Sequence, residues 1–155
     1  LIIGIVSTFI LLLWRISRPH IAEIGLVEGT QHFRNIQRHQ VITSAKVLSI
    51  RIDEDLTFLN SNTLKGFLIN AVSQKPELEH VVINGSSISA IDLSALEMLE
   101  DLDNELRKLN IQLHFSEVKG PVMDKLQRSK LLNHLSGKIF LTHYQAIREL
   151  SPDIT

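Results

Sequence analysis

The sequence predicts an α/β fold in which a mixed, largely parallel sheet of about four or five strands packs against about four or five helices. Three observations favour this class. Strand-type and helix-type segments alternate from residue 20 to the end of the chain and are joined by short links. Residues 46–53 alternate apolar and polar side chains with the period of two that is typical of a strand. Residues 80–84 are apolar and bounded by turn residues, as expected of a central strand covered on both faces.

The chain opens with an apolar run, residues 1–14, which has no initiator Met and is followed at once by Arg15 and Arg18. A membrane-spanning helix needs about 20 apolar residues, so we interpret residues 1–17 as the C-terminal part of the last transmembrane helix of a larger protein. The two arginines suit the cytoplasmic headgroup interface. Residues 18–155 are then expected to form one cytoplasmic domain, because about 135 residues provide a core for one domain but not for two.

Two other interpretations of the apolar run stay open. A secretory signal peptide would place positive charge before the run, whereas here the charges follow it. A helix buried in the core of a water-soluble protein would also be apolar over this length. The interpretation as a membrane anchor therefore requires that this helix is not packed inside the domain.

The first part of the predicted domain contains two strands separated by a loop. Residues 20–27 carry β-branched side chains and end at Glu28 and Gly29, so they are predicted to form a strand that ends in a turn. Residues 30–40 are polar and poor in aromatic residues, and we predict a connecting loop. The alternation in residues 46–53 predicts a strand with one covered face.

Two amphipathic helices are predicted next. Asn60 and Ser61 can cap the first helix, and its apolar residues recur at steps of three and four, at Leu64, Phe67, Leu68, Ala71 and Val72. Asp92 is expected to cap the second helix by accepting hydrogen bonds from free amides of the first turn. The apolar stripe of the second helix consists of Ala95, Leu99, Leu102, Leu106 and Leu109. Its acidic residues are expected to face solvent, and they are Glu97, Glu100, Asp101, Asp103 and Glu105.

The end of the chain is predicted to contain two more strands and two more helices. Residues 111–115 are predicted to form a strand, and Gly120 with Pro121 begins a helix that runs toward Leu131. A short strand at residues 139–141 and a helix at residues 143–150 close the chain.

In largely parallel sheets, ligand and partner sites gather where the carboxyl ends of strands meet the amino ends of helices. In this chain that place is residues 85–94, where the helix after Asp92 presents unpaired amides and the positive end of its dipole. We therefore predict a ligand or partner surface here. Its candidate residues are Gly85, Ser86, Ser87 and Ser89.

The composition argues against several classes of function. The formal net charge is −1, and no stretch interleaves aromatic residues with Lys and Arg, so nucleic acid is not an expected partner. Without cysteine there is no disulfide, thiolate metal site or cysteine nucleophile. The seven histidines lack the spacing of a metal site and are interpreted as scattered surface or strand-end residues. No Walker loop, dinucleotide-binding glycine pattern or nucleophile elbow occurs, so we expect no enzyme, no metal and no cofactor.

Four stretches of the chain resemble the STAS domains that follow the last membrane helix of SulP-type anion permeases. They are SRPHIAEIG at residues 17–25, LTFLNS at 56–61, VVINGSSISAIDLSALEML at 81–99 and VKGPVMDKLQRSKLL at 118–132. Their order, their spacing and the apolar run before them are specific in combination, and the resemblance spans nearly the entire chain. It implies a STAS-like fold and a place in a transporter of the sulfate permease family.

The resemblance also implies a function. It implies a non-catalytic regulatory and interaction domain of a secondary anion transporter, whose substrate would be sulfate, bicarbonate or a dicarboxylate. The domain would lie in the cytoplasm, attached to a multi-pass protein of the cell (inner) membrane. The implied partners are the transmembrane domain of the same polypeptide, a second copy in a homodimer, and a cytosolic protein such as acyl carrier protein.

STAS domains also include bacterial anti-sigma factor antagonists, whose control site is a Ser or Thr two residues after an aspartate at the start of this helix. Asp92 and Ser94 stand at the matching positions, and a phosphate on Ser94 would add about −1.5 to −2 charges at a helix amino end. Leu93 replaces the hydroxyl residue common in the antagonists and Ala95 replaces their glycine, and both departures count against kinase recognition. A phosphoswitch at Ser94 is therefore the alternative function, and an ordinary first-turn serine bonded to nearby backbone is the other reading of Ser94.

Overall fold

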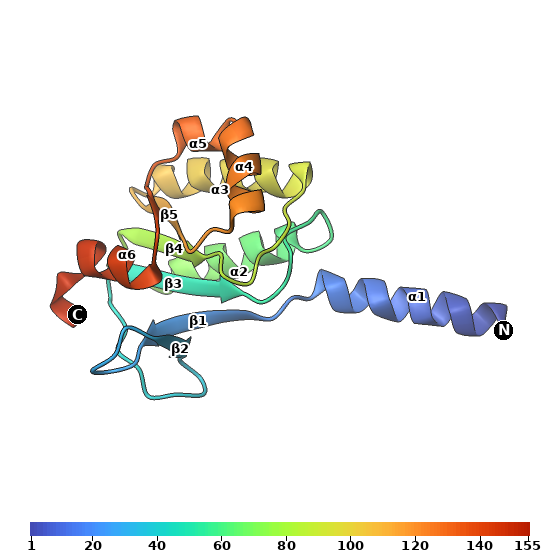
Figure 1. Ribbon diagram of the computed structural model, residues 1–155, viewed down its shortest axis with the longest axis horizontal. Helices are drawn as coiled ribbons and strands as arrows, with labels where there is room; N and C mark the ends of the chain where they lie inside the picture. Colours follow the sequence, from blue (N-terminus) through green and yellow to red (C-terminus); the bar gives the residue numbers. More distant parts are fainter.

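A six-stranded mixed sheet forms the centre of the computed structural model, which describes all residues from Leu1 to Thr155 (Figure 1). The strand order is β2-β1-β3-β4-β5-β6. β1 is antiparallel to both β2 and β3, whereas β3 to β6 are parallel to one another. The strands are β1 (Ile21–Leu26), β2 (Phe33–Asn35), β3 (Val47–Ile52), β4 (His80–Asn84), β5 (Gln112–Ser116) and β6 (Ile139–Phe140).

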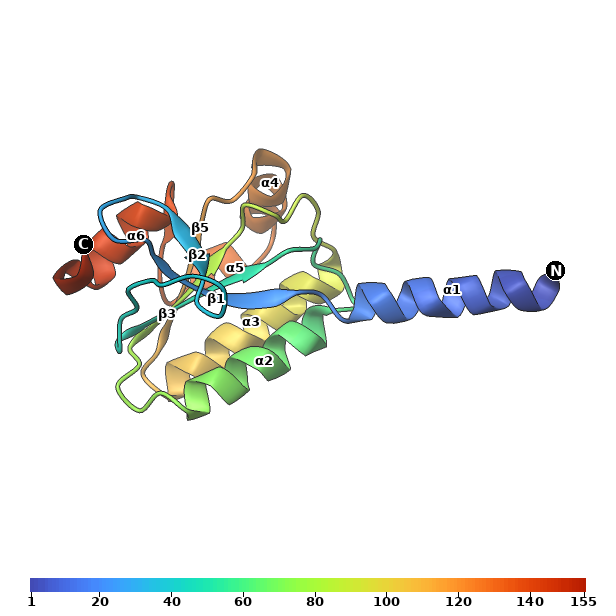
Figure 2. The same cartoon turned by 90° about the horizontal axis from the view of Figure 1, so that it is seen from below.

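Helices cover both faces of this sheet, but unequally. α2 to α5 lie on one face, where α2 and α3 run side by side (Figure 2), and α6 lies on the other. The helices are α1 (Ile2–Ser17), α2 (Ser61–Ser73), α3 (Leu93–Lys108), α4 (Gly120–Arg128), α5 (Leu131–His134) and α6 (His143–Leu150), followed by a short 3-10 helix (Pro152–Ile154). The predicted class, a mixed and largely parallel sheet packed against helices, is confirmed.

The alternation of side chains along β3 explains why there are two layers. Leu48 and Ile50 are fully buried in the larger core, under α2 and α3. Val47 points the other way and is buried in a smaller core, to which α6 contributes Ala146 and Ile147. The prediction of a single covered face was therefore wrong. The alternation in the sequence distinguishes two faces, but it does not reveal that α6 covers the second one.

The predicted loop at residues 30–40 contains β2, which makes the sheet wider than expected. The three residues of β2, Phe33–Asn35, carry no strand-like pattern of their own. They are held by pairing with β1, in which Leu26 stands opposite Phe33 and Ile24 stands opposite Asn35. This edge strand is therefore specified by its neighbour more than by its own side chains.

Asn60 precedes α2 but does not cap it with its side chain, so this detail of the prediction was wrong. Its Oδ1 accepts a hydrogen bond from the Thr57 amide at 3.0 Å, and its Nδ2 donates to the Asp55 carbonyl at 2.7 Å. Asn60 is fully buried and holds the turn before the helix. Within α2 the predicted core positions Leu64 and Leu68 are fully buried.

Asp92 caps α3 as predicted, with its Oδ1 accepting from the Ala95 amide at 2.8 Å. Two details of the predicted helix faces were wrong. Leu109 lies just beyond the end of α3 and is 57% exposed. Asp103, which we expected to face solvent, is only 2% exposed. Its carboxylate is buried because the Ser136 amide donates to it at 3.1 Å and thereby supplies a partner inside the protein.

The helix predicted after Gly120 is divided in two. α4 ends at Arg128, because the next residue, Ser129, is extended with ψ 165° and its hydroxyl donates to the Leu126 carbonyl at 2.7 Å. Leu131 then begins α5 and is buried. Leu141, which we expected in the last strand, lies beyond β6 and is exposed.

α1 projects away from the domain (Figure 1). None of its side chains is buried, so the structure does not show the alternative of a packed core helix. At its C-terminal end the Thr63 hydroxyl donates to the Ser17 carbonyl at 3.0 Å, and the Arg18 guanidinium lies 4.9 Å from the centroid of the Trp14 ring. Every helix of the structure, α1 included, is either too short or not apolar enough to span a membrane.

His143 lies in the layer between the sheet and α6, contrary to the predicted surface or strand-end position. It is 1% exposed. Its Nε2 lies 2.9 Å from the Ser49 hydroxyl oxygen and its Nδ1 lies 2.7 Å from the Ser116 hydroxyl oxygen. Burial lowers the pKa of His143 to about 4, so the ring is neutral at physiological pH.

His114 on β5 is a second buried histidine in this layer. Its Nε2 lies 3.2 Å from His80 Nδ1, and its own Nδ1 accepts from the Lys138 amide at 3.0 Å. Burial, with a smaller contribution from His80 and Lys138, lowers the pKa of His114 to about 4. Residue 137 must be glycine for the chain to pass this close to the His114 ring. A Cβ on it would lie 2.5 Å from His114 Nδ1 and 2.3 Å from the Leu113 carbonyl oxygen.

Candidate interaction site at the strand tips

Residues 85–92 connect the carboxyl end of β4 to α3 and begin beside the carboxyl end of β5, and we call this segment the strand-tip loop. It begins tightly against β5. The amide of Gly85 donates to the Ser116 carbonyl at 2.8 Å, and a Cβ on Gly85 would be 3.4 Å from that oxygen. The Asn84 side chain then accepts from the Ser86 amide at 2.9 Å and fixes the first turn.

Asp55, from the connection between β3 and α2, holds the middle of the strand-tip loop. Its Oδ1 accepts from the Ser89 amide at 2.7 Å and from the Ala90 amide at 2.9 Å. Leu56 forms an isolated parallel bridge with Ile91. The loop is therefore held mainly through its backbone amides, and the Ser87 hydroxyl adds a longer hydrogen bond to Asp53 Oδ1 at 3.4 Å.

Asp92 connects the end of the strand-tip loop to the same connection. While Oδ1 caps α3, Oδ2 accepts from the Phe58 amide at 2.8 Å. One carboxylate therefore fixes two segments that are 34 residues apart in the chain. As a result, Phe58 is held next to the first turn of α3, which contains Leu93 and Ser94.

Phe58 and Leu93 are 64% and 70% exposed, and Asp92 brings the two residues to the same place, so we call them the apolar patch. Ser94, beside Leu93, is exposed as well. The carboxyl end of β3 points toward the side from which α1 leaves the domain (Figure 1). Exposed single apolar residues are ordinary, whereas these two are held at one place, on the side of the domain from which α1 leaves.

The predicted candidate residues have different surroundings in the structure. Gly85 is buried, Ser86 is exposed and Ser87 is partly buried. The Ser89 hydroxyl accepts from Lys119 Nζ at 2.9 Å. Phe58 was not predicted as a site residue, although it lies in one of the four stretches that carry the family resemblance. Nothing in the local pattern indicates that its amide meets a carboxylate from a distant helix.

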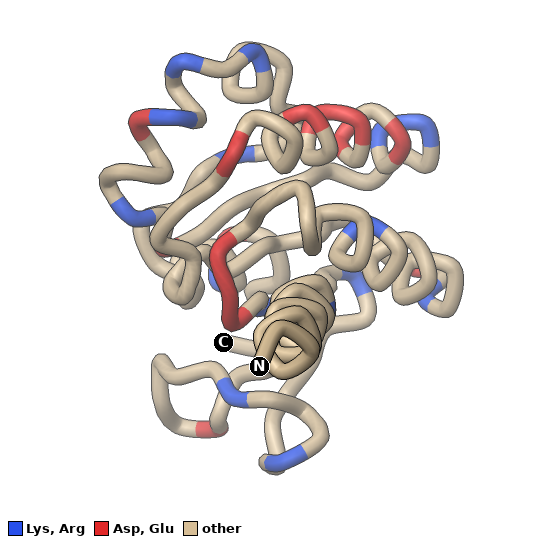
Figure 3. The backbone as a smooth tube through the Cα atoms, turned by 90° about the vertical axis from the view of Figure 1, so that its right-hand side faces the viewer, with Lys and Arg blue, Asp and Glu red and all other residues tan.

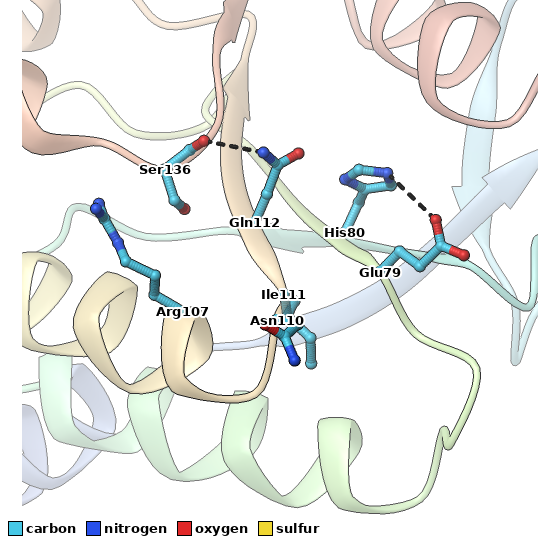
Figure 4. A pocket seen from close by; sticks show the side chains of 7 residues that line it. All are labelled: Glu79, His80, Arg107, Asn110, Ile111, Gln112 and Ser136. Carbon is cyan, nitrogen blue, oxygen red and sulfur yellow. Dashed lines mark hydrogen bonds and ion pairs between the residues drawn. The ribbon is translucent and has the colours of Figure 1, made fainter.

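The largest cavity lies elsewhere, at the amino ends of β4 and β5 (Figure 4). It measures about 570 Å³ and is lined by one apolar residue, Ile111, among polar ones. Its cationic group is already engaged, because Arg107 Nη2 donates to Asp103 Oδ2 at 2.9 Å and also to the His134 carbonyl. No group of three or more His, Asp or Glu residues in the structure is placed to hold a metal ion.

The sequence matches the STAS domain family over residues 37–146. Among curated relatives, sulfate transporter 1.3 of Arabidopsis thaliana is 32% identical over an alignment that covers all of this chain and 25% of the relative. High affinity sulfate transporter 2 of Stylosanthes hamata is 31% identical, with 98% of this chain and 25% of the relative covered. The chain thus spans about a quarter of the length of these relatives.

Solved structures give the same fold. The murine SLC26A9 anion transporter matches 94% of this chain and 24% of its own, with TM-score 0.80 and 14% identity. The STAS domain of a SulP transporter from Vibrio cholerae matches 77% of this chain and 90% of its own, with TM-score 0.60 and 12% identity. The phosphorylated form of the Bacillus cell-fate determinant SpoIIAA covers 70% of this chain and 94% of its own, with TM-score 0.54 and 16% identity.

The fold and the match over residues 37–146 agree with each other. The curated relatives are sulfate transporters, which agrees with the predicted resemblance to SulP-type permeases. The chain therefore belongs to the STAS domain family.

Proposed function

We propose that this chain is the cytoplasmic regulatory and interaction domain of a SulP-type secondary anion transporter, and that residues 1–17 are the end of its last transmembrane helix. The similarity to sulfate transporters supports this, since it includes the apolar helix as well as the domain. The exposure of α1 supports it too: its residues 2–15 are exposed and none of its residues is buried, and an apolar helix in this state needs lipid or another protein around it.

The observation that carries the proposal is the apolar patch of Phe58 and Leu93 at the strand tips, together with the contact between Thr63 and the end of α1. Thr63, in the first turn of α2, donates to the Ser17 carbonyl, so the connection that carries Phe58 stays close to the point where the chain would enter the membrane. In the whole protein this patch docks on the membrane part of the same polypeptide. Burial of apolar side chains then couples the position of the domain to the transport pathway.

A transport assay on the full-length protein tests the proposal. We expect anion uptake to fall when residues 20–155 are deleted, and sulfate to be the preferred anion in a panel with bicarbonate and a dicarboxylate. The double variant Phe58→Ser and Leu93→Ser should lower uptake by about threefold or more, since a weakened docking contact costs about 1 kcal/mol per exposed apolar side chain.

Leu109→Ser is the matched control for that assay. Leu109 is also exposed, but it lies at the opposite end of α3 from Leu93. Its replacement should leave uptake unchanged. Equal uptake by the double variant, the control and the unchanged protein would contradict docking through the patch. A homodimer and an acyl carrier protein partner stay predictions that follow from the family resemblance alone.

A phosphoswitch at Ser94 is the second candidate function, and the exposure of Ser94 in the first turn of α3 favours it. A phosphate there would meet free amides at the positive end of the helix dipole and would add charge beside the apolar patch. We expect Ser94→Glu to lower uptake in the same assay, with Ser73→Glu, at an exposed serine at the other end of α2, as the control. Phosphopeptide analysis of the protein from its host that finds no modification, together with unchanged uptake by Ser94→Glu, would eliminate the switch.

A further inference from the structure

The charges of this chain are distributed unevenly. Residues 15–51 contain six of the 16 Lys and Arg residues but only two of the 17 Asp and Glu residues. Acidic residues gather along α3, on the far side of the molecule from the β1–β2 hairpin (Figure 3). The net charge of −1 therefore conceals a basic region, and this region contains a cavity.

The cavity measures about 370 Å³ and lies beside β2, at the beginning of β1 and the end of β3. We call it the β2 cavity. No apolar residue lines it. Its charged and titratable lining residues are His20, Arg34, Arg38, His39, Arg51 and Asp53. The lining therefore carries three guanidinium groups and one carboxylate.

That carboxylate is already used within the protein. Asp53 Oδ1 accepts from Arg51 Nε at 2.6 Å, and Asp53 Oδ2 lies 2.9 Å from His20 Nδ1. Burial favours a higher pKa for Asp53, but the hydrogen bonds with Arg51 and His20 outweigh it and lower the pKa overall. By contrast, the guanidinium groups of Arg34 and Arg38 make no hydrogen bond and no ion pair in the structure.

The chain around Arg38 is fixed before any ligand arrives. The carbonyl of Asn35 accepts from the Arg38 amide at 3.1 Å and from the His39 amide at 3.2 Å. The Asn35 side chain also accepts from the Gln37 amide at 2.8 Å, and Asn35 itself is buried. This turn returns Arg38 and His39 to the cavity wall, so binding would not have to order that segment.

We propose that the β2 cavity binds a tetrahedral oxyanion, a sulfate or phosphate group, through Arg38 and Arg34. A guanidinium group presents donors in a planar fork that matches two oxygens of such an anion. The oxyanion can be a free ion or the phosphate of a lipid headgroup. His20 lies three residues beyond the end of α1 and so within about 10 Å of it, which places the cavity near headgroups if α1 lies in a membrane.

The soluble source is tested by titrating the full chain, in a neutral detergent, with sodium sulfate or sodium phosphate at constant ionic strength set by chloride. Calorimetry or NMR shifts of the arginine side chains report binding. The double variant Arg34→Gln and Arg38→Gln should bind at least about tenfold more weakly, since charge-assisted hydrogen bonds are lost. The control double variant Arg128→Gln and Arg148→Gln removes equal charge from exposed arginines on α4 and α6 and should bind like the unchanged chain.

The lipid source is tested by flotation of the same chains with vesicles of phosphatidylcholine, with and without phosphatidylserine. If a headgroup occupies the cavity, phosphatidylserine increases partitioning by about fivefold for each arginine involved, and only the Arg34 and Arg38 double variant loses this increase. Binding in either experiment that depends on Arg34 and Arg38 supports the proposal and identifies the source. Failure of sulfate, phosphate and phosphatidylserine alike, or equal losses in the two double variants, would overturn it.

The same flotation separates this proposal from the proposed function. Partitioning into pure phosphatidylcholine reports on α1 alone, because those vesicles offer no net negative charge. Its absence would contradict the membrane role of α1, while binding of soluble sulfate or phosphate would still support the β2 cavity as an oxyanion site.

Discussion

Acidification is expected to destabilise the domain, with the free energy of unfolding falling by about 3 kcal/mol through His143 alone as the pH drops from about 6.5 to about 4. The reason is the burial of the ring between the sheet and α6. Its two nitrogens face the hydroxyl groups of Ser49 and Ser116, and neither hydroxyl carries a negative charge that could compensate an imidazolium.

The sign of this effect follows from which state binds the proton. The pKa of His143 is lower in the folded protein than in the unfolded chain, so between the two values the unfolded chain binds more protons. The stability contributed by the neutral ring is complete above about pH 6.5, is lost progressively as the pH falls, and changes no further below about pH 4. The lowered pKa of His114 adds a loss of the same sign over the same range.

Urea unfolding followed by circular dichroism over this pH range measures the effect. His143→Gln should be less stable at neutral pH, but its stability should fall less steeply on acidification because one buried titrating group is gone. His32→Gln is the matched control, since His32 is exposed, and it should reproduce the full pH dependence. Parallel pH profiles for His143→Gln and the unchanged chain would show that another group is responsible.

Local pattern was sufficient to predict most elements of this fold. The predicted strand at residues 80–84 and the predicted helix at residues 143–150 coincide with β4 and α6, because turn residues and caps bound their apolar residues. The Asp92 cap was predicted for the same reason, since a cap acts over three residues. The strand-tip location followed from the parallel order of the strands.

Contacts between distant segments could not be predicted from one sequence. Asp55 and Ser89 are 34 residues apart, and only the finished fold brings this carboxylate to that amide. β2 is missed because its pairing with β1 outweighs its own weak pattern. The burial of His143 was not predicted, although the helix that contains it was. Which face α6 presents to the sheet depends on β6 and the connection before it, and the sequence of the helix alone does not reveal this.

Asp103 is a position at which the sequence pattern allows both a buried and an exposed side chain. It lies four residues after Leu99 and one residue after Leu102, so on a helical wheel it borders the apolar stripe of α3. A charged side chain at the border of a stripe can equally well turn to solvent or be buried with partners. In this protein Asp103 is buried, because the Ser136 amide donates to its carboxylate at 3.1 Å and the Ser136 hydroxyl donates to the same carboxylate.

Replacing Asp103 by alanine is therefore expected to lower the free energy of unfolding by about 2 kcal/mol, because the partly buried donors of Ser136 lose a charged acceptor. The Ser136 amide and hydroxyl hydrogen would lose their acceptor, although the hydroxyl oxygen would still accept from the Leu113 amide, and Arg107 would lose its ion-pair partner one turn away on α3. Arg107 is 51% exposed, so water can replace part of its bond, and most of the loss should come from Ser136.

Asp101→Ala is the matched control for that prediction. It makes the same chemical change two residues earlier on the same helix, where the side chain is exposed, and it should change stability by less than about 0.5 kcal/mol. Asp103→Asn should fall between the two, because an amide oxygen still accepts a hydrogen bond but carries no charge. Chemical denaturation of the three variants measures the order. If Asp103→Ala and Asp101→Ala were equally stable, the buried carboxylate would not be what joins the loop before β6 to α3.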